Sequence, residues 1–409
     1  MKKSKQSIYN ILVYLGGLAL LINNRTIWIN EEGISFKVNI ISYGILCVSL
    51  IILILFAVVQ KKKITSNVLN DMLLLIGLTL VYFVFSSEIS KSVVIRLGLL
   101  VILLFLYIYF ENSFIPKILI AYKNILLLVG SISLFFWLFG SILGMLHSNI
   151  YINSNWGAVN GVTRLVPSYN NIYFETQRIS APLLGDIYRN SSIFSEGPMA
   201  SLNFTLGLLI ELIERKNKLS ITVFILCVIS TFSTTGYIVL LILLFMKFIN
   251  TSKITTYTKL MLIVPTTILV AFLILFFINQ KFINNSESAS VRLNDFYLGF
   301  TTWLQHPIFG NGINNIGALT ENMESWRLSN SGFSNSIMEV LAEGGIYVFS
   351  IYIYSFINAI KYAKAKRSVD LFCFIVGVIF LFVSTSFPFQ YILITILIWF
   401  SMLDSKRGV

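Results

Sequence analysis

Residues 290–304 read SVRLNDFYLGFTTWL and lie between two hydrophobic segments of the chain. Their apolar side chains recur at helical spacing, which predicts an amphipathic helix whose apolar side is formed by Leu293, Phe296, Phe300 and Leu304. Pro307 should end this helix, because proline disfavours a helical conformation in the residue before it. The predicted helix is the first part of a long polar segment. Because hydrophobic spans flank this segment on both sides, we expect it to lie at a membrane surface.

The segment continues with features that predict a structured loop. Ile308-Phe-Gly-Asn-Gly-Ile313 contains two glycines, which permit tight backbone and the close approach of another group. A mostly polar run follows from Glu321 to Asn335, and a new apolar segment then carries Glu339 and Glu343 one helical turn apart. A loop this long is usually functional or disordered. The helical pattern argues against disorder and in favour of function.

The composition defines the class of protein. The chain has 409 residues, of which 56% are hydrophobic and 12% charged, and its mean hydropathy is +0.82, as expected of a polytopic membrane protein. A net charge of +12 would suggest a nucleic-acid partner in a soluble protein, but here lysines and arginines on cytoplasmic loops explain it. Cys47, Cys227 and Cys373 lie in apolar spans without metal-ligand spacing, so we expect neither a disulfide framework nor a metal site.

Apolar segments of spanning length predict an all-α fold with about twelve transmembrane helices. They lie near residues 7–23, 38–60, 68–86, 93–110, 118–145, 197–213, 219–232, 235–250, 260–279, 342–360, 369–385 and 387–403. With both termini in the cytoplasm, the lysine-rich clusters near 61–63, 215–218 and 361–367 face inward. The chain 1–409 is then a single membrane domain with two long outer loops, 146–196 and 280–341.

The cations predicted to lie outside differ in kind from those inside. Inside, lysine predominates, as expected of solvated anchors, whereas the two long outer loops carry Arg164, Arg178, Arg189, Arg292 and Arg327. A guanidinium group offers planar, paired donors that fit phosphate or carboxylate, which a lysine ammonium does not. These arginines either bind an anionic substrate or brace acidic residues of the same loops, and the pattern leaves both readings open.

The second long loop resembles a known signature. Arg292, Trp303 and His306-Pro-Ile-Phe-Gly-Asn-Gly312 resemble the "R…W…hPlfGvG" pattern of the bacterial O-antigen polymerase and ligase superfamily. Members of that superfamily continue with "HN…E.G", and Ser334-Asn335 and Glu343-Gly-Gly345 occupy those places here. Because a serine replaces the histidine that ligases are thought to use, the resemblance favours the polymerase branch.

The end of the first long loop supports the same branch. Arg189-Asn-Ser-Ser-Ile-Phe-Ser-Glu-Gly-Pro198 is similar to the "R..giF.EP" motif of Wzy-type polymerases, particularly those of capsular polysaccharides, with Gly197 inserted. Ser233-Thr-Thr-Gly236 stands where many members carry "SRG", so the arginine of that motif is absent.

The resemblance implies a GT-C-like membrane glycosyltransferase in the cytoplasmic (inner) membrane of a bacterium. Its substrates would be undecaprenyl-pyrophosphate-linked oligosaccharides, its partners membrane lipid and a chain-length regulator protein, and it would need neither a metal nor another cofactor. Arg189 and Arg292 would clamp the departing pyrophosphate, and Glu196 would act as the base toward the acceptor hydroxyl. The alternative role for Glu196 is a structural ion pair with Arg189.

Further substrate-binding residues are expected at Arg164, Arg178, His306, Asn311, Arg327, Asn335 and Glu343. Asn311 could touch sugar hydroxyls, whereas His306 precedes a proline and suits a hydrogen-bonding strut better than a catalyst. Two other functions stay open: a ligase-type glycan transferase, and a transporter or flippase of lipid-linked sugars. A transporter should carry charges within its membrane spans.

Overall fold

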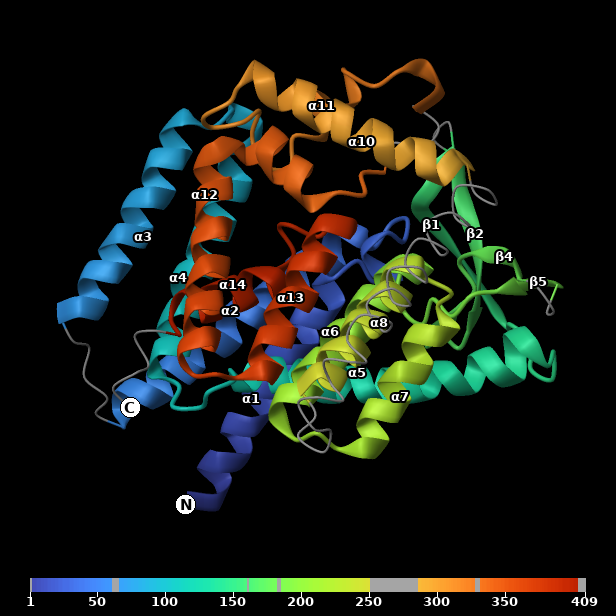
Figure 1. Cartoon of the computed structure of the whole chain (residues 1–409), viewed down its shortest axis with the longest axis horizontal. Helices are drawn as coiled ribbons and strands as arrows, with labels where there is room; N and C mark the ends of the chain where they lie inside the picture. Colours follow the sequence, from blue (N-terminus) through green and yellow to red (C-terminus); the bar gives the residue numbers. More distant parts are fainter. Residues whose placement is uncertain are drawn as a thin grey trace.

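The computed structural model describes residues 2–60, 66–159, 162–181, 185–250, 286–327 and 332–403, most of them helical (Figure 1). The helices are α1 Lys2–Asn23, α2 Ser35–Val59, α3 Ser66–Phe85, α4 Lys91–Phe110, α5 Lys117–Phe136, α6 Gly197–Glu214, α7 Lys218–Ser230, α8 Thr234–Asn250, α10 Ser286–Gln305, α11 Ile316–Thr320, α12 Ser336–Ala365, α13 Val369–Ser384 and α14 Tyr391–Ser401. Short 3-10 helices lie at Ile27–Ile29, Glu88–Ser90 and Ser325–Arg327, and a π-helical turn lies at Trp137–Ile142. Each predicted span within the described ranges coincides with a helix, and the one predicted at 260–279 lies outside them.

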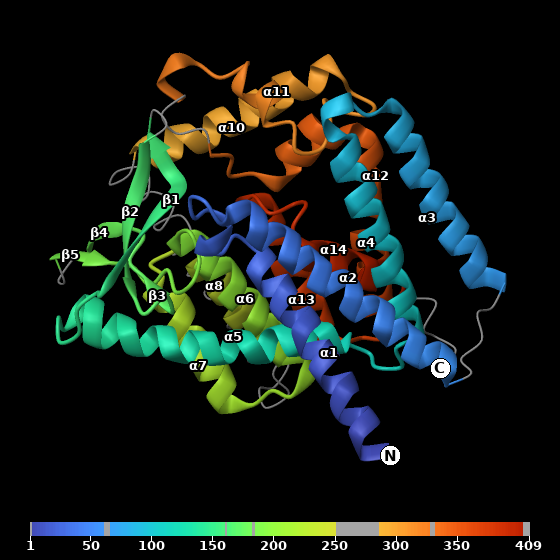
Figure 2. The same cartoon turned by 180° about the vertical axis from the view of Figure 1, so that it is seen from behind.

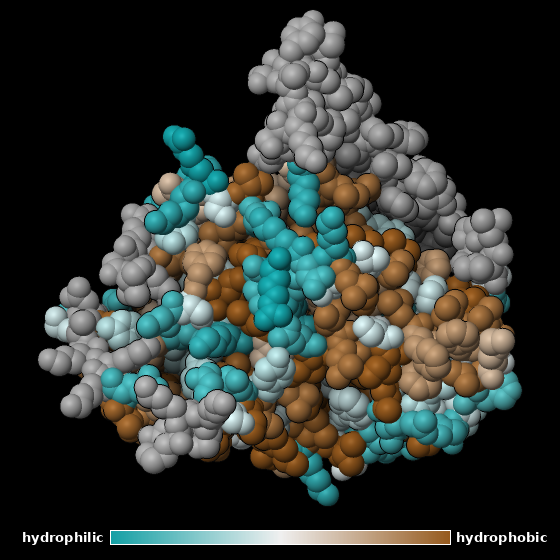
Figure 3. Space-filling view, turned by 90° about the horizontal axis from the view of Figure 1, so that it is seen from below, coloured by the Kyte–Doolittle hydropathy of each residue, from teal (hydrophilic) through white to brown (hydrophobic). Residues whose placement is uncertain are grey.

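The described residues contain six helices that are long and apolar enough to cross a membrane, in agreement with a membrane protein. These candidate spans are Gln6–Asn23, Ser35–Val59, Val68–Phe85, Lys91–Phe110, Lys117–Ile142 and Ser336–Ala365. Helices α7, α8, α13 and α14 are apolar but shorter, so a total of twelve crossings stays a prediction. The face opposite α10 is largely hydrophobic, with a band of hydrophilic residues across it (Figure 3).

The first long loop is not helical, so the prediction of an all-α chain is wrong for this region. It forms five strands: β1 Ile150–Val159, β2 Val162–Tyr169, β3 Tyr173–Phe174, β4 Arg178–Ala181 and β5 Gly185–Tyr188. Strands β1, β2 and β3 make one antiparallel sheet, and β4 pairs with β5 in a second. Along β1, Ile152 and Ser154 are buried while Tyr151 and Asn153 are exposed, as expected of a strand with one covered side.

The segment quoted above forms the layer that covers one face of the molecule. Helix α10 spans the predicted stretch and ends at Gln305, two residues before Pro307, as predicted. Helices α3, α4 and α12 run side by side, and α10 lies across their ends, packed on α12, between α3 and the β1–β2 hairpin (Figures 1 and 2). We refer to this side of the molecule as the α10 face.

Helix α12 is broken near its start, and the loop after α10 fills the break. Gly345 has a φ of +63°, outside the helical region. The amides of Ile346 and Tyr347 donate to the carbonyls of Pro307 and Ile308, and Asn311 and Gly312 donate back to Ala342 and Glu343, all at 2.8–3.0 Å. A side chain on Gly310 or Gly345 would collide with the backbone of the other segment. Gly310 of the motif thus serves this backbone contact, whereas a Cβ on Gly312 would collide with the side chains of Ser87 and Ser90.

Candidate functional site

The residues between β5 and α6 form a buried loop that brings Glu196 to the start of α6. Asn190 to Ser195 are almost wholly inaccessible to solvent. The loop pairs with the residues that follow α1: Ile27 donates its amide to the carbonyl of Ile193 at 2.8 Å, and Ser195 donates to the carbonyl of Arg25 at 3.1 Å. Glu196 then stands at the N-cap of α6, where the helix dipole favours negative charge.

Arg189 is held in place at the other end of this loop. Its Nε and Nη2 donate to the carbonyls of Thr231 and Phe232 at 2.7 and 2.9 Å, and Nη1 donates to Gln177 Oε1 at 3.3 Å. The side chain of Arg189 passes so close to Gly197 that a Cβ at this position would collide with it. The position therefore requires glycine. Burial lowers the pKa of Arg189 to about 10, although the charge of Glu196 opposes the shift.

Arg292 approaches the same carboxylate from a different element. It lies on α10 and donates from Nη1 to the carbonyl of Ser384, at the end of α13, at 3.2 Å. Burial lowers the pKa of Arg292, and the charges of Glu196 and Asp295 oppose this. Glu196 therefore lies within electrostatic reach of both guanidinium groups. The charge of Glu196, at the start of α6, thus acts on Arg189 from the first loop and on Arg292 from α10.

Arg25 is a further arginine of this region that the sequence did not single out as a site residue. It follows α1 and donates from Nη2 to Ser386 Oγ at 2.9 Å, while Ser386 donates its hydroxyl hydrogen to Glu339. Its guanidinium group also lies over the ring of Trp156, 5.5 Å from the centroid. We define the arginine cluster as Arg25, Arg189 and Arg292 with the carboxylates of Glu196 and Glu339.

Arg327 has a different environment, although it was predicted to bind substrate. Its side chain is 0% exposed, and Nη2 lies 2.5 Å from Asp295 Oδ1. The other carboxylate oxygen of Asp295 accepts from the amide and the hydroxyl of Ser334 at 3.0 and 2.6 Å. Burial raises the pKa of Asp295, although Ser334 and Arg327 oppose the shift. Arg327 therefore braces an acidic residue of the same loop, and we remove it from the proposed binding residues.

Asn311 and Glu343 take part in the break of α12. Asn311 donates from Nδ2 to the carbonyls of Thr302 and Ala342, and Glu343 Oε2 accepts from the amide of Asn314 at 2.7 Å. Both side chains thus form hydrogen bonds with the protein backbone at the break of α12. Asn335 caps α12 through Oδ1, but its Nδ2 is buried and has no hydrogen-bond partner among the described residues. That orphaned donor keeps Asn335 a candidate for contact with a ligand.

The remaining predicted residues lie at the surface. Arg164 is exposed on β2, and Arg178, also exposed, places its guanidinium group 4.7 Å from the centre of the Tyr188 ring. The side chain of His306 is exposed as well, while its carbonyl accepts from the amide of Gly310 at 2.9 Å. His306 therefore supports the turn through its backbone rather than through its ring.

The chemistry of the arginine cluster suits a large anion. Guanidinium groups offer paired N–H donors that fit phosphate oxygens. In the described part of the chain no three His, Cys, Asp or Glu side chains are grouped so that they could hold a metal ion. Comparisons with protein-family models, curated proteins and solved structures found no match for this chain. The functional argument therefore rests on the site itself.

Proposed function

We propose that the protein is a polysaccharide polymerase that transfers a growing glycan from undecaprenyl pyrophosphate onto a lipid-linked repeat unit at the outer face of the membrane. One observation carries the proposal: Arg189 and Arg292, from separate elements, lie within electrostatic reach of the same carboxylate, Glu196. A site for this reaction needs fixed positive charge for the departing pyrophosphate and a base for the acceptor hydroxyl.

In the proposed reaction the hydroxyl oxygen of the acceptor sugar attacks the anomeric carbon that bears the pyrophosphate. The bond from this carbon to the pyrophosphate oxygen breaks, and its electron pair leaves with the pyrophosphate. Arg189 and Arg292 stabilise that developing charge with their remaining N–H groups, while their bonds to the carbonyls of Thr231, Phe232 and Ser384 hold the guanidinium groups in place. Glu196 accepts the hydroxyl proton.

The polymerase branch is favoured over the ligase branch by the environment of Ser334. Ser334 occupies the position at which the ligase signature has histidine. Both its amide and its hydroxyl donate to Asp295. The position therefore serves a structural interaction here, and the base must come from elsewhere, for which Glu196 is the candidate.

The deciding experiment is the glycan profile of a strain that lacks the protein. Loss of a polymerase leaves single lipid-linked repeat units at the outer face, and the wild-type chain restores polymer. Long polymer that fails to attach to its acceptor would instead indicate a ligase. Purified protein given lipid-linked repeat units should also make polymer in the presence of a chelator, since the proposed clamp consists of arginines.

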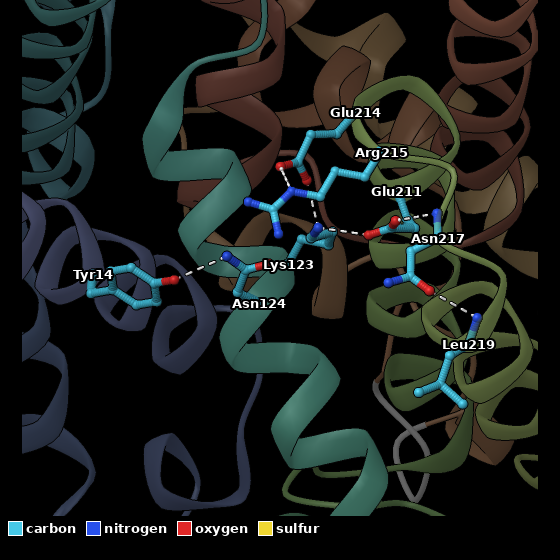
Figure 4. Close-up of polar contacts among 8 residues, drawn as sticks. All are labelled: Tyr14, Lys123, Asn124, Glu211, Glu214, Arg215, Asn217 and Leu219. Atoms are coloured by element: carbon cyan, nitrogen blue, oxygen red, sulfur yellow. Dashed lines mark hydrogen bonds and ion pairs between the residues drawn. The ribbon is translucent and has the colours of Figure 1, made fainter.

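One observation favours the transporter as a second candidate. Lys123 lies in a candidate span and is buried, with Nζ 2.6 Å from Glu211 and 2.5 Å from Glu214 (Figure 4). Arg215 pairs with Glu214, and the amide of Asn217 donates to Glu211. Buried charges in spans often line ion or substrate pathways. Repeat units trapped at the inner face of the deletion strain, and abolished export in Lys123→Met, would support transport and contradict the polymerase.

A further inference from the structure

Helix α10 has two faces of opposite character. The face toward α12 contains Asp295, Leu298 and Thr302, each at most 2% exposed. The opposite face carries an apolar stripe whose members are between 43 and 67% exposed: Leu293, Phe296, Tyr297, Phe300 and Leu304. An amphipathic helix normally turns its apolar side toward the protein interior. Here Asp295, Gly299 and Thr302 face inward beside Leu298, whereas the five large apolar residues of the stripe face outward, so the stripe needs another apolar environment.

The helix cannot rotate to bury this stripe in the protein. On the inward face, Asp295 is bound to Arg327 and to Ser334, and Arg292 donates to the carbonyl of Ser384. Gly299 packs so closely on Met338 of α12 that a Cβ there would collide with it. Rotation would break a buried ion pair and remove this contact. The outward position of the stripe is therefore fixed by the fold.

The loop that follows the stripe contacts the end of a candidate membrane span. Val84 and Phe85 at the end of α3, and Ile89 just after it, are between 61 and 72% exposed. The ring of Phe85 stacks on that of Phe309 with centroids 4.5 Å apart, which joins the end of α3 to the loop that follows α10. Exposed Ile308 lies between this contact and the stripe in sequence. The exposed apolar residues at the end of α3 are thus joined, through Phe85 and Phe309, to the loop that follows the stripe.

The direction of α10 fits a helix that lies in the plane of a membrane surface. It runs across the ends of α3, α4 and α12 rather than alongside them (Figures 1 and 2). Helices of this kind place aromatic and aliphatic residues into the boundary between head groups and acyl chains. Aromatic side chains, which make up three of the five stripe residues, are the type that collects at such interfaces.

We propose that α10 lies on the outer leaflet with its apolar stripe, Leu293 to Leu304, inserted between the lipids, so that the lipid surface is what covers it. Arg292 lies on the same helix and is thereby held at the level of the lipid head groups. The proposal depends on the membrane protein class and, for the choice of leaflet, on the predicted topology, but not on the polymerase reaction.

Fluorescence quenching of the full-length protein in lipid nanodiscs tests this placement. Phe296→Cys and Phe300→Cys, each labelled with an environment-sensitive dye, are compared with Asn322→Cys, an exposed polar control on the same face of the molecule. The native cysteines Cys47, Cys227 and Cys373 are buried, and unsubstituted protein gives the background labelling. Lipids with a spin label high in the acyl chain should quench both stripe positions several-fold more strongly than the control, and aqueous iodide should do the reverse.

Two results would overturn the proposal. Iodide quenching at Phe296→Cys and Phe300→Cys as strong as at Asn322→Cys would show that the stripe faces water. Protection from both quenchers would show that protein covers it, and crosslinking from Phe300→Cys would then identify the covering segment. Unfolding midpoints close to that of the unsubstituted protein confirm that labelling leaves the fold intact, because both positions are on the surface.

Discussion

Arg327 and Arg292 both contact helix α10 or belong to it, yet their surroundings differ. Arg327 is fully buried and directly paired with Asp295, which in turn is saturated by Ser334. Arg292 donates to a backbone carbonyl, and the carboxylate of Glu196 acts on it and on Arg189 together. Arg327 is bonded directly to a carboxylate, which stabilises the fold, whereas Glu196 and Asp295 act on Arg292 through their charge. Arg292 on α10 and Arg327 beside this helix thus have different surroundings, and we propose that only the first binds substrate.

The largest effect is expected where the buried pair is broken. Asp295→Asn leaves Arg327 as an uncompensated buried charge and should lower the free energy of unfolding by about 3–5 kcal/mol. Thermal unfolding in detergent measures this, with exposed Asp186→Asn as the control. The double variant Asp295→Leu with Arg327→Met should recover most of the loss. Unchanged stability of Asp295→Asn would contradict the brace.

Arg292→Lys should act on turnover instead of on stability. Lysine keeps the charge but loses the planar pair of donors, so polymer formation should fall about 100- to 1000-fold, as for other lost transition-state donors. The purified assay with lipid-linked repeat units measures it, and Arg178→Lys serves as the surface control. If Arg292→Lys lowered the free energy of unfolding as much as Asp295→Asn does, Arg292 would have a structural role like that of Arg327.

Glu196→Gln tests the carboxylate that the two arginines share. The amide keeps the shape of the side chain but cannot take a proton, so turnover should fall about 100-fold or more while donor binding is largely retained. Single-turnover rates and binding of the lipid-linked donor separate the two quantities. Glu339→Gln, in the same cluster but bonded to Ser386, is the matched variant and should have the smaller effect. Full activity of Glu196→Gln would exclude it as the base.

The smallest effect is expected at Arg164, which the sequence placed among the binding residues. Its side chain is exposed on β2, so Arg164→Ala should change polymer yield by less than about twofold and stability by less than about 0.5 kcal/mol. Polymer length on gels and the unfolding midpoint measure this. A large loss of polymer at normal stability would return Arg164 to the site and extend the arginine cluster to the hairpin.

Features that depend on local signals could be predicted from the sequence. The helix over 290–304 and its end before Pro307 follow from periodicity and from the conformational limits of proline. The hairpin β1–β2 had local signals as well, since apolar residues alternate around Ile152 and the sequence Asn160-Gly161 is typical of a two-residue turn. The strongly apolar composition favours helices over the whole chain and outweighs this local strand signal.

Features that depend on distant parts of the chain could not be predicted. Arg25 meets Ser386, 361 positions away, and no local pattern predicts that contact. The pairing of Arg327 with Asp295 required the packing of α10 to be known, because spacing alone fits bracing and binding equally well. The predicted span began at 342, whereas α12 begins at Ser336, because the apolar signal starts only near the break at Gly345.

The break in α12 has a consequence for how the chain enters a membrane. Beyond Gly345 the helix is apolar and can satisfy its own amides, except for Ile346 and Tyr347, whose acceptors belong to the loop synthesised before it. The turns from Ser336 to Glu343 carry two glutamates and depend on the same loop, so they need not be inserted with the rest of the helix. We expect this region to form in two stages, with insertion of the apolar half first and docking of the turns from Ser336 to Glu343 onto the loop afterwards.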